Sequence, residues 1–194
     1  SRHAGDNSKL RESLTEIQRA GERAAALTSQ LLALSRKQVV TPRVLDLSVV
    51  IQDMSGMFRR LIGEDILLRT EFEPALPPVR ADLAQIEQIL LNLVVNARDA
   101  MPRGGELRIA LRSAAAGDSI VPRCQHVFLE ISDTGHGITP EVKRQIFEPF
   151  FTTKPVGEGT GLGLSTVYGS VREMGGSIEV ESEPGAGAMF RLTI

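Results

Sequence analysis

The stretch of the chain that is most informative about the fold is Asp133-Thr134-Gly135-His136-Gly137-Ile138. The seven residues from Val127 to Asp133 have the pattern of a β-strand, so this strand is predicted to end in a carboxylate. The two glycines after it indicate a turn. Taken alone, Asp-x-Gly is more often a plain turn than a binding site. Its meaning depends on one stretch before it and one after it.

The earlier stretch is Asn92-Leu93-Val94-Val95-Asn96-Ala97-Arg98-Asp99-Ala100. It lies in a predicted helix of about 19 residues that Asp82 caps and that ends before Pro102. Placing residues every 100° gathers one polar stripe beside a broad apolar arc. The stripe contains Gln88, Asn92, Asn96 and Asp99, and the arc contains Ile86, Ile89, Leu90, Leu93 and Ala97.

Buried amides need partners, and a ligand would supply them. An asparagine oxygen is a hard, neutral ligand for Mg²⁺, which takes further oxygens from phosphates and water. The alternative is that the amides of this helix bridge to a neighbouring loop.

The later stretch is Gly157-Glu158-Gly159-Thr160-Gly161-Leu162-Gly163-Leu164, in which glycine stands at alternate positions. A helix is predicted to begin at Leu162, so free backbone N–H groups and the positive helix end favour a phosphate. The stretch is neither a P-loop nor a Gly-x-Gly-x-x-Gly motif. An ionised Asp133 accepts a hydrogen bond from an exocyclic amine, which favours adenine. The three stretches together predict ATP with its metal.

Between Phe147 and Gly161, prolines and glycines exclude regular structure. We expect a lid over the ligand, with Phe147, Phe150 and Phe151 as its apolar hinge and Lys154 reaching the phosphates. Simple core packing is the alternative role for Phe147.

Composition excludes several classes of protein. The 194 residues are 42% hydrophobic and 24% charged, with a net charge of -2. No stretch approaches about eighteen apolar residues, so no membrane crossing or direct membrane contact is expected. The chain lacks the basic cluster that a nucleic-acid surface needs. The single Cys124 excludes an internal disulfide, and a cytoplasmic setting is expected.

The remaining pattern predicts an α/β two-layer sandwich, because mostly hairpin-joined strands alternate with helices available for one face. Strands are predicted at 43–47, 66–72, 106–112, 127–133, 176–182 and 188–194. Helices are predicted at 48–60, from Asp82, at 140–147 and at 162–174. One long helix over 9–38 precedes them and carries a heptad seam. It should pack against another helix or fold back onto the domain.

Four ordered motifs resemble the boxes of sensor histidine kinases, within the superfamily shared with type II topoisomerases and MutL. Asn92 to Met101 resembles the N box, Asp133 to Gly137 the G1 box, Phe147 to Lys154 the F box, and Gly159 to Leu164 the G2 box. The resemblance covers about 46–194 and implies a Bergerat sandwich, a mixed sheet with helices on one face. The sequence of these motifs is most similar to that of the hybrid and nitrogen-regulation type of sensor histidine kinase.

The resemblance implies a set of site residues. Asn96 would hold Mg²⁺, Asp133 would bind the adenine amine, and Asn92, Asn96 and Lys154 would form the catalytic group. The ATP-binding residues would be Asn92, Asn96, Asp99, Asp133, Gly135, Gly137, Phe150, Lys154, Gly159, Thr160, Gly161, Leu162, Gly163 and Leu164.

The family's phosphoacceptor histidine lies on the first helix of a dimerisation hairpin, of which 9–38 resembles the second helix. The chain's histidines, His3, His126 and His136, stand in other contexts. We therefore expect a fragment of a longer sensor protein: 1–41 as partial hairpin and linker, and 42–194 as the ATP-binding domain. Expected partners are the hairpin histidine, a response-regulator receiver domain, and a second copy through 9–38.

Two other functions stay open, a hydrolytic ATPase and a nucleotide-binding regulatory module without turnover. Hydrolytic relatives carry a glutamate four residues before the metal asparagine, whereas this chain has Asn92, which is not a base at neutral pH. Slow hydrolysis is therefore expected.

Overall fold

The computed structural model describes residues 41–113, 126–155 and 159–194. Thr41–Thr153 and Gly161–Ile194 form one compact unit, called here the α/β unit, and Lys154–Thr160 is grouped with 1–40 in another. The long helix expected over 9–38 lies outside the described residues.

The α/β unit contains a five-stranded mixed sheet, with its strands in the order β2-β4-β5-β7-β6. Its strands are β2 (Ile66–Phe72), β4 (Gly105–Ser113), β5 (Val127–Asp133), β6 (Ser177–Ser182) and β7 (Ala188–Thr193). Only the β2–β4 pairing is parallel, and the other three are antiparallel. A parallel pair needs a crossover connection, which α3 (Leu83–Ala100) supplies between β2 and β4.

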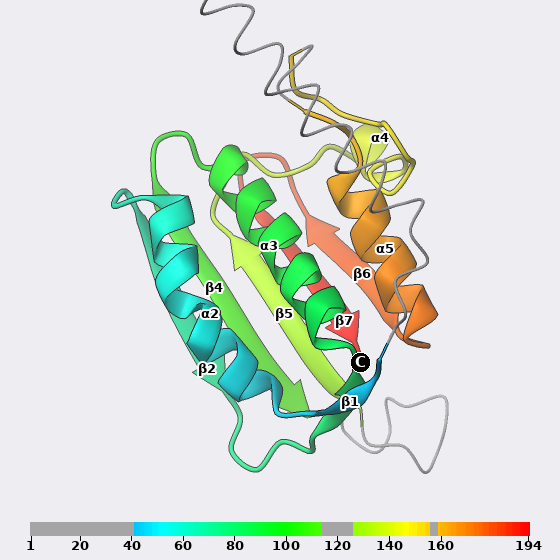
Figure 1. Ribbon diagram of the computed structural model, residues 1–194. Helices are drawn as coiled ribbons and strands as arrows, with labels where there is room; N and C mark the ends of the chain where they lie inside the picture. Colours follow the sequence, from blue (N-terminus) through cyan, green and yellow to red (C-terminus); the bar gives the residue numbers. More distant parts are fainter. Residues whose placement is uncertain (1–40, 114–125, 156–158) are drawn as a thin grey trace, which may run out of the picture. The chain divides into compact units, whose positions relative to one another are not determined.

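Three helices cover one face of this sheet: α2 (Leu47–Ile62), α3 and α5 (Gly163–Glu173) (Figure 1). The inward side chains of β4 and β5 alternate with outward ones and are buried, as are those of α3 that face them. They are Leu107, Ile109, Leu111, Leu129, Ile131, Ile86, Ile89, Leu90, Leu93 and Ala97. The predicted two-layer sandwich and the predicted apolar arc of α3 are both confirmed.

Asp82 begins α3 as predicted. Its Oδ1 accepts hydrogen bonds from the backbone N–H groups of Ala84 and Gln85, and its Oδ2 accepts from Thr41. These bonds, led by the one from Thr41, lower the pKa of the Asp82 carboxyl. The cap fixes where α3 starts and therefore which of its residues reach its far end.

Local predictions were wrong at four places. The strand predicted over 43–47 ends at Leu45, because Leu47 is already the first residue of α2. Asp46, not Ser48, caps α2, because the Asp46 carboxylate accepts from the Ser48 N–H. The helix predicted over 140–147 ends at Lys143, as α4 (Pro140–Lys143). A strand not predicted, β3 (Val79–Ala81), pairs with β1 (Arg43–Leu45) in a separate two-stranded sheet.

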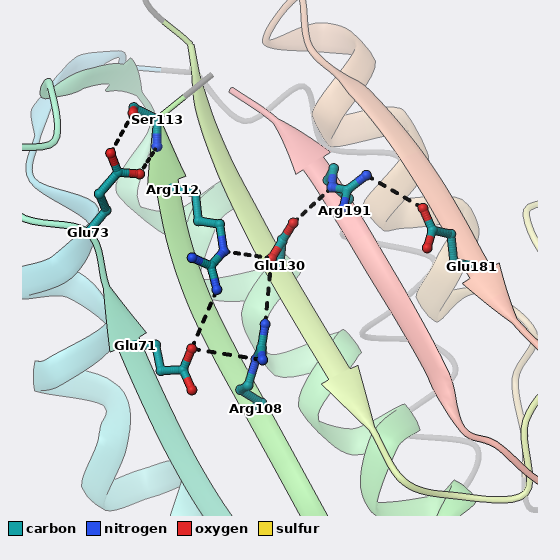
Figure 2. Close-up of polar contacts among 8 residues, drawn as sticks. All are labelled: Glu71, Glu73, Arg108, Arg112, Ser113, Glu130, Glu181 and Arg191. Carbon is teal, nitrogen blue, oxygen red and sulfur yellow. Dashed lines mark hydrogen bonds and ion pairs between the residues drawn. The ribbon is translucent and has the colours of Figure 1, made fainter. Parts of the chain in front are cut away.

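The outward face of the sheet carries a cluster of charged side chains centred on Glu130, which is only 5% exposed. Its carboxylate accepts from Nε of Arg191 at 2.9 Å and Nε of Arg112 at 3.3 Å, and Arg108 lies 3.9 Å away (Figure 2). The hydrogen bond that Arg191 donates to Glu130 is the main cause that raises the pKa of Arg191. A buried carboxylate needs such partners to offset its desolvation, so β5 is fixed on both faces.

Candidate functional site

The end of β5, the end of α3, the start of α5 and the β6–β7 turn meet at one edge of the sheet (Figure 1). The first two stretches singled out in the sequence therefore lie near the part of the third that begins at Gly161, although all three are far apart along the chain.

Asp133 ends β5 with its side chain buried and the residue 9% exposed. Its Oδ1 accepts a hydrogen bond from the Gly135 N–H at 2.8 Å. Burial raises the pKa of this carboxyl, while bonds from the backbone of Gly135 and Ala188 and the nearby His136 oppose the rise. A carboxylate in such a dry position is a strong and selective acceptor for a ligand amine.

The two glycines of this loop lie close to other backbone segments of the protein. A Cβ at Gly135 would lie 2.5 Å from the Ala100 carbonyl oxygen, and one at Gly137, where φ is +70°, would clash with the Glu183 carbonyl. Both glycines are required by contacts within the protein, which shape the loop around Asp133.

Asn92 and Asn96 are half-buried on α3, and the start of α5 lies against them. A Cβ built on Gly163 would lie 3.8 Å from Asn92 Oδ1 and 3.9 Å from Asn96 Nδ2. Gln88, at the other end of the stripe, is exposed and donates from Nε2 to Asn92 Oδ1 at 3.3 Å. The amide stripe and the glycine stretch thus face the same space.

Asp99 is half-buried and paired with its neighbour. The Arg98 guanidinium donates to Asp99 Oδ1 through Nε at 2.8 Å and Nη2 at 2.6 Å. A direct role for Asp99 in nucleotide binding stays a prediction.

The start of α5 has the features of an anion-binding helix end. Leu162, its N-cap residue, is buried and makes no side-chain capping bond, and Leu164 packs against the core. Gly161 has φ of +66°, and its carbonyl accepts from the Phe150 N–H at 2.9 Å. Backbone N–H groups at a helix start are donors for phosphate oxygens.

The phenylalanines of the predicted hinge have different surroundings. Phe147 and Phe151 pack partly against the core, and the Phe147 ring lies 5.2 Å from that of Tyr168. This favours the core-packing role for Phe147. Phe150 is 63% exposed and has φ of +68°, which is uncommon for a residue with a side chain.

Lys154, Gly159 and Thr160 belong to the unit that includes 1–40, and their roles at the phosphates stay predictions. Within 41–113, 126–155 and 159–194 no group of three or more His, Cys, Asp or Glu side chains could hold a metal. The described residues could hold Mg²⁺ only in the way that the sequence predicts, with one neutral oxygen from Asn96 and further oxygens from phosphates. None of the described helices is both long and apolar enough to span a membrane.

Sequence reasoning missed the residues that hold the Asp133 loop from outside. Ala100 accepts from the His136 N–H at 3.1 Å, and Ser182 accepts from the Ile138 N–H at 2.8 Å. The sequence signal for Ser182 was its position at the end of the predicted strand 176–182, directly before Glu183-Pro184-Gly185.

Comparisons with known proteins agree with this geometry. The family described as "Histidine kinase-, DNA gyrase B-, and HSP90-like ATPase" matches residues 81–194. The sensor kinase CckA of Brucella abortus is 47% identical over 185 residues, which cover 92% of this chain and 20% of that protein. The sensor histidine kinase ZraS of Klebsiella oxytoca is 36% identical, covering 89% of this chain and 35% of that protein.

Among solved structures, full-length ShkA in complex with AMPPNP is similar, with a TM-score of 0.77 and 25% identity. The match covers 94% of this chain and 38% of ShkA. This chain therefore spans well under half of each of these three proteins.

Proposed function

The chain belongs to the family of histidine kinase-, DNA gyrase B- and HSP90-like ATPases, and we propose that it is the catalytic domain of a protein-histidine kinase. It binds ATP with Mg²⁺ and donates the γ-phosphoryl group to a histidine on a phosphotransfer hairpin. The signalling protein that contains it would be a two-component sensor kinase.

One observation carries the nucleotide site: the start of α5 at Gly163 lies against Asn92 and Asn96. A helix start offers N–H groups and partial positive charge, and the amides offer neutral oxygens. This is the pairing that a metal-bound triphosphate needs. Asp133, at the end of β5 on the same edge of the sheet, adds an acceptor for the base.

Each group has a role in this proposal. Asp133 accepts from the adenine amine, with Gly135 and Gly137 shaping its loop. The N–H groups from Gly161 to Leu164 bind phosphate oxygens, and Asn96 gives an oxygen to the metal. Mg²⁺ would supply neutralising charge on the phosphates, which is most of what phosphoryl transfer requires of its catalyst.

Lys154, Phe150, Gly159 and Thr160 would belong to the lid that closes over the phosphates. Because Lys154 is a cation, its contact should strengthen as charge develops on the transferred group.

The hydrolytic alternative is disfavoured by Asn92. A water-activating base at this position needs a carboxylate, but the Asn92 amide is neutral and its Oδ1 already accepts from Gln88. The similar proteins named as sensor kinases also support transfer to a histidine rather than to water.

The parts of the sensor protein outside the described residues belong to the proposal too. Residues 1–41 would form part of the dimerisation hairpin and linker, with 42–194 as the ATP-binding domain in the cytoplasm. A second copy would associate through 9–38, and a receiver domain would take the phosphoryl group from the hairpin histidine. Light scattering with and without residues 1–38 measures self-association, and a monomer in both cases would contradict pairing through this segment.

The decisive experiment supplies the chain with ATP and Mg²⁺ together with a separate hairpin that carries the acceptor histidine. An acid-labile, alkali-stable phosphate on the hairpin is the expected product. The matched control is the same mixture without Mg²⁺. Rapid phosphate release without labelling would favour a hydrolytic ATPase, and tight ATP binding with neither product would favour a regulatory module.

A further inference from the structure

The segment 182–188, which is the turn between β6 and β7 with the strand residue on each side, contacts the loop from Asp133 to Ile138 at several points. Two of these contacts are close backbone approaches. A Cβ on Gly187 would clash with the Asp133 carbonyl, and one on Gly137 would clash with the Glu183 carbonyl. The two segments are therefore in backbone contact near both Asp133 and Gly137.

Hydrogen bonds join the same two segments. The Gly185 N–H donates to the His136 carbonyl at 2.7 Å. A hydrogen bond from the backbone of Ala188 is one of the influences on the Asp133 carboxyl itself. The turn thus reaches the beginning and the middle of the loop through backbone groups alone.

Ser182, the last residue of β6, makes side-chain hydrogen bonds to both segments. The Ile138 N–H donates to Ser182 Oγ at 2.8 Å, and the Ser182 hydroxyl donates to the Gly187 carbonyl at 2.6 Å. The hydroxyl therefore links the far end of the loop to the part of the turn that packs against Asp133. Ser182 is half-buried, so water replaces these bonds only in part.

We propose that Ser182 is a positioning residue for the base-binding loop: it holds the loop from Asp133 to Ile138 in the shape that accepts adenine. This inference rests on the proposed function, in which the loop binds adenine. It assigns no contact between Ser182 and the nucleotide. Ser182 acts through Ile138 and Gly187, and a loss of its hydroxyl lowers the fraction of molecules whose loop is competent to bind.

The size of the effect follows from that fraction. Apparent affinity falls in proportion to the population of the binding-competent shape, and each lost hydrogen bond lowers the equilibrium constant for that shape roughly fivefold. Ser182→Ala removes two such bonds, the one from the Ile138 N–H and the one to the Gly187 carbonyl, and should therefore weaken ATP binding by up to roughly 25-fold. Ser182→Thr keeps a hydroxyl at the same position and should restore the affinity.

Ser177→Ala is the matched control. Ser177 lies at the opposite end of the same hairpin, where its hydroxyl donates to Thr193 Oγ1 at 3.2 Å. It removes one serine hydroxyl from the same strand and should leave nucleotide affinity unchanged.

The experiment measures calorimetric affinity for ATP and for inosine triphosphate, which has a carbonyl in place of the adenine amine. Ser182→Ala should weaken ATP more than inosine triphosphate, because the loop carries the group that reads the amine. Hydrogen exchange at the Ile138 amide, without nucleotide, should accelerate in Ser182→Ala and return to normal in Ser182→Thr.

Equal weakening of both nucleotides, or no rescue by threonine, would show a general structural role and overturn the inference. Unchanged ATP affinity in Ser182→Ala would overturn it as well. Failure of the unmodified chain to bind ATP is a separate result, because it overturns the proposed function before any variant is compared.

Discussion

Replacing Asp133 by asparagine tests the base-binding assignment most directly. Asp133 is buried and its Oδ1 already accepts the Gly135 N–H at 2.8 Å. The asparagine carbonyl can keep that bond, so the new amide NH₂ would face the adenine amine, and two donors would meet. The loop geometry is preserved while the acceptor for the ligand is lost.

The expected loss is that of a ligand donor left without its acceptor, about 1–3 kcal/mol. At about 1.4 kcal/mol for each factor of ten, ATP affinity should fall by roughly 5- to 150-fold. Inosine triphosphate has a carbonyl at this position, which the carboxylate repels and the asparagine NH₂ can donate to, so it should bind the variant at least as tightly as the unmodified chain. Calorimetric titration of both nucleotides against both proteins measures the difference.

The same substitution should not destabilise the protein at neutral pH. Burial raises the pKa of Asp133 in the folded state, so its contribution to stability is greatest at low pH and is lost as pH rises through that pKa. The asparagine variant should therefore unfold at an equal or higher temperature than the unmodified chain at neutral pH. As pH falls, the unfolding temperature of the unmodified chain should rise relative to that of the asparagine variant.

Equal affinity of the unmodified chain for ATP and inosine triphosphate would refute the role of Asp133 as the base reader. A strong loss of thermal stability at neutral pH in Asp133→Asn would contradict the energetic argument from burial.

Three further predictions concern the phosphate and metal side of the site. Asn96→Ala should abolish the part of ATP affinity that depends on Mg²⁺ and leave thermal unfolding nearly unchanged, which titrations with and without Mg²⁺ measure; unchanged affinity with Mg²⁺ would remove the metal assignment. Gly161→Ala should lower the free energy of unfolding in urea by at least about 1–2 kcal/mol, because φ is +66° and the new Cβ would lie 2.5 Å from the Phe150 carbonyl oxygen. The control Gly169→Ala, which has open space around it in α5, should raise the free energy of unfolding by up to about 1 kcal/mol. Lys154→Ala should slow phosphoryl transfer to the supplied hairpin more than it weakens ATP binding, and equal losses in both would place Lys154 in ground-state binding instead.

Much of the local structure could be predicted because it depends on short-range patterns. The bounds of β2 and β5 match the predicted strands, and Asp82 caps α3 where the sequence placed it. Side chains at i, i+3, i+4 and i+7 share a helix face, so the polar stripe with Asn92 and Asn96 follows from spacing alone.

Predictions failed where two local solutions were nearly equal or where the partner was distant. Asp46 and Ser48 are both good capping residues, and the sequence could not choose between them. The strand β3 has three residues and follows a proline cluster, so only its pairing with β1 reveals it. The parallel pairing of β2 with β4 likewise leaves no local signal.

Sequence patterns were enough to predict which residues would bind the nucleotide: the amides of α3, the carboxylate that ends β5 and the glycines before α5. Their spacing and type reflect local geometry, in which helix period, strand ends and backbone freedom act within a few residues. Only tertiary packing places Gly163 against Asn92 and Asn96, and joins Ser182 to Ile138 by a hydrogen bond. Such contacts join segments tens of residues apart, and they exist because the buried core and the register of β5, β6 and β7 fix where each chain segment ends.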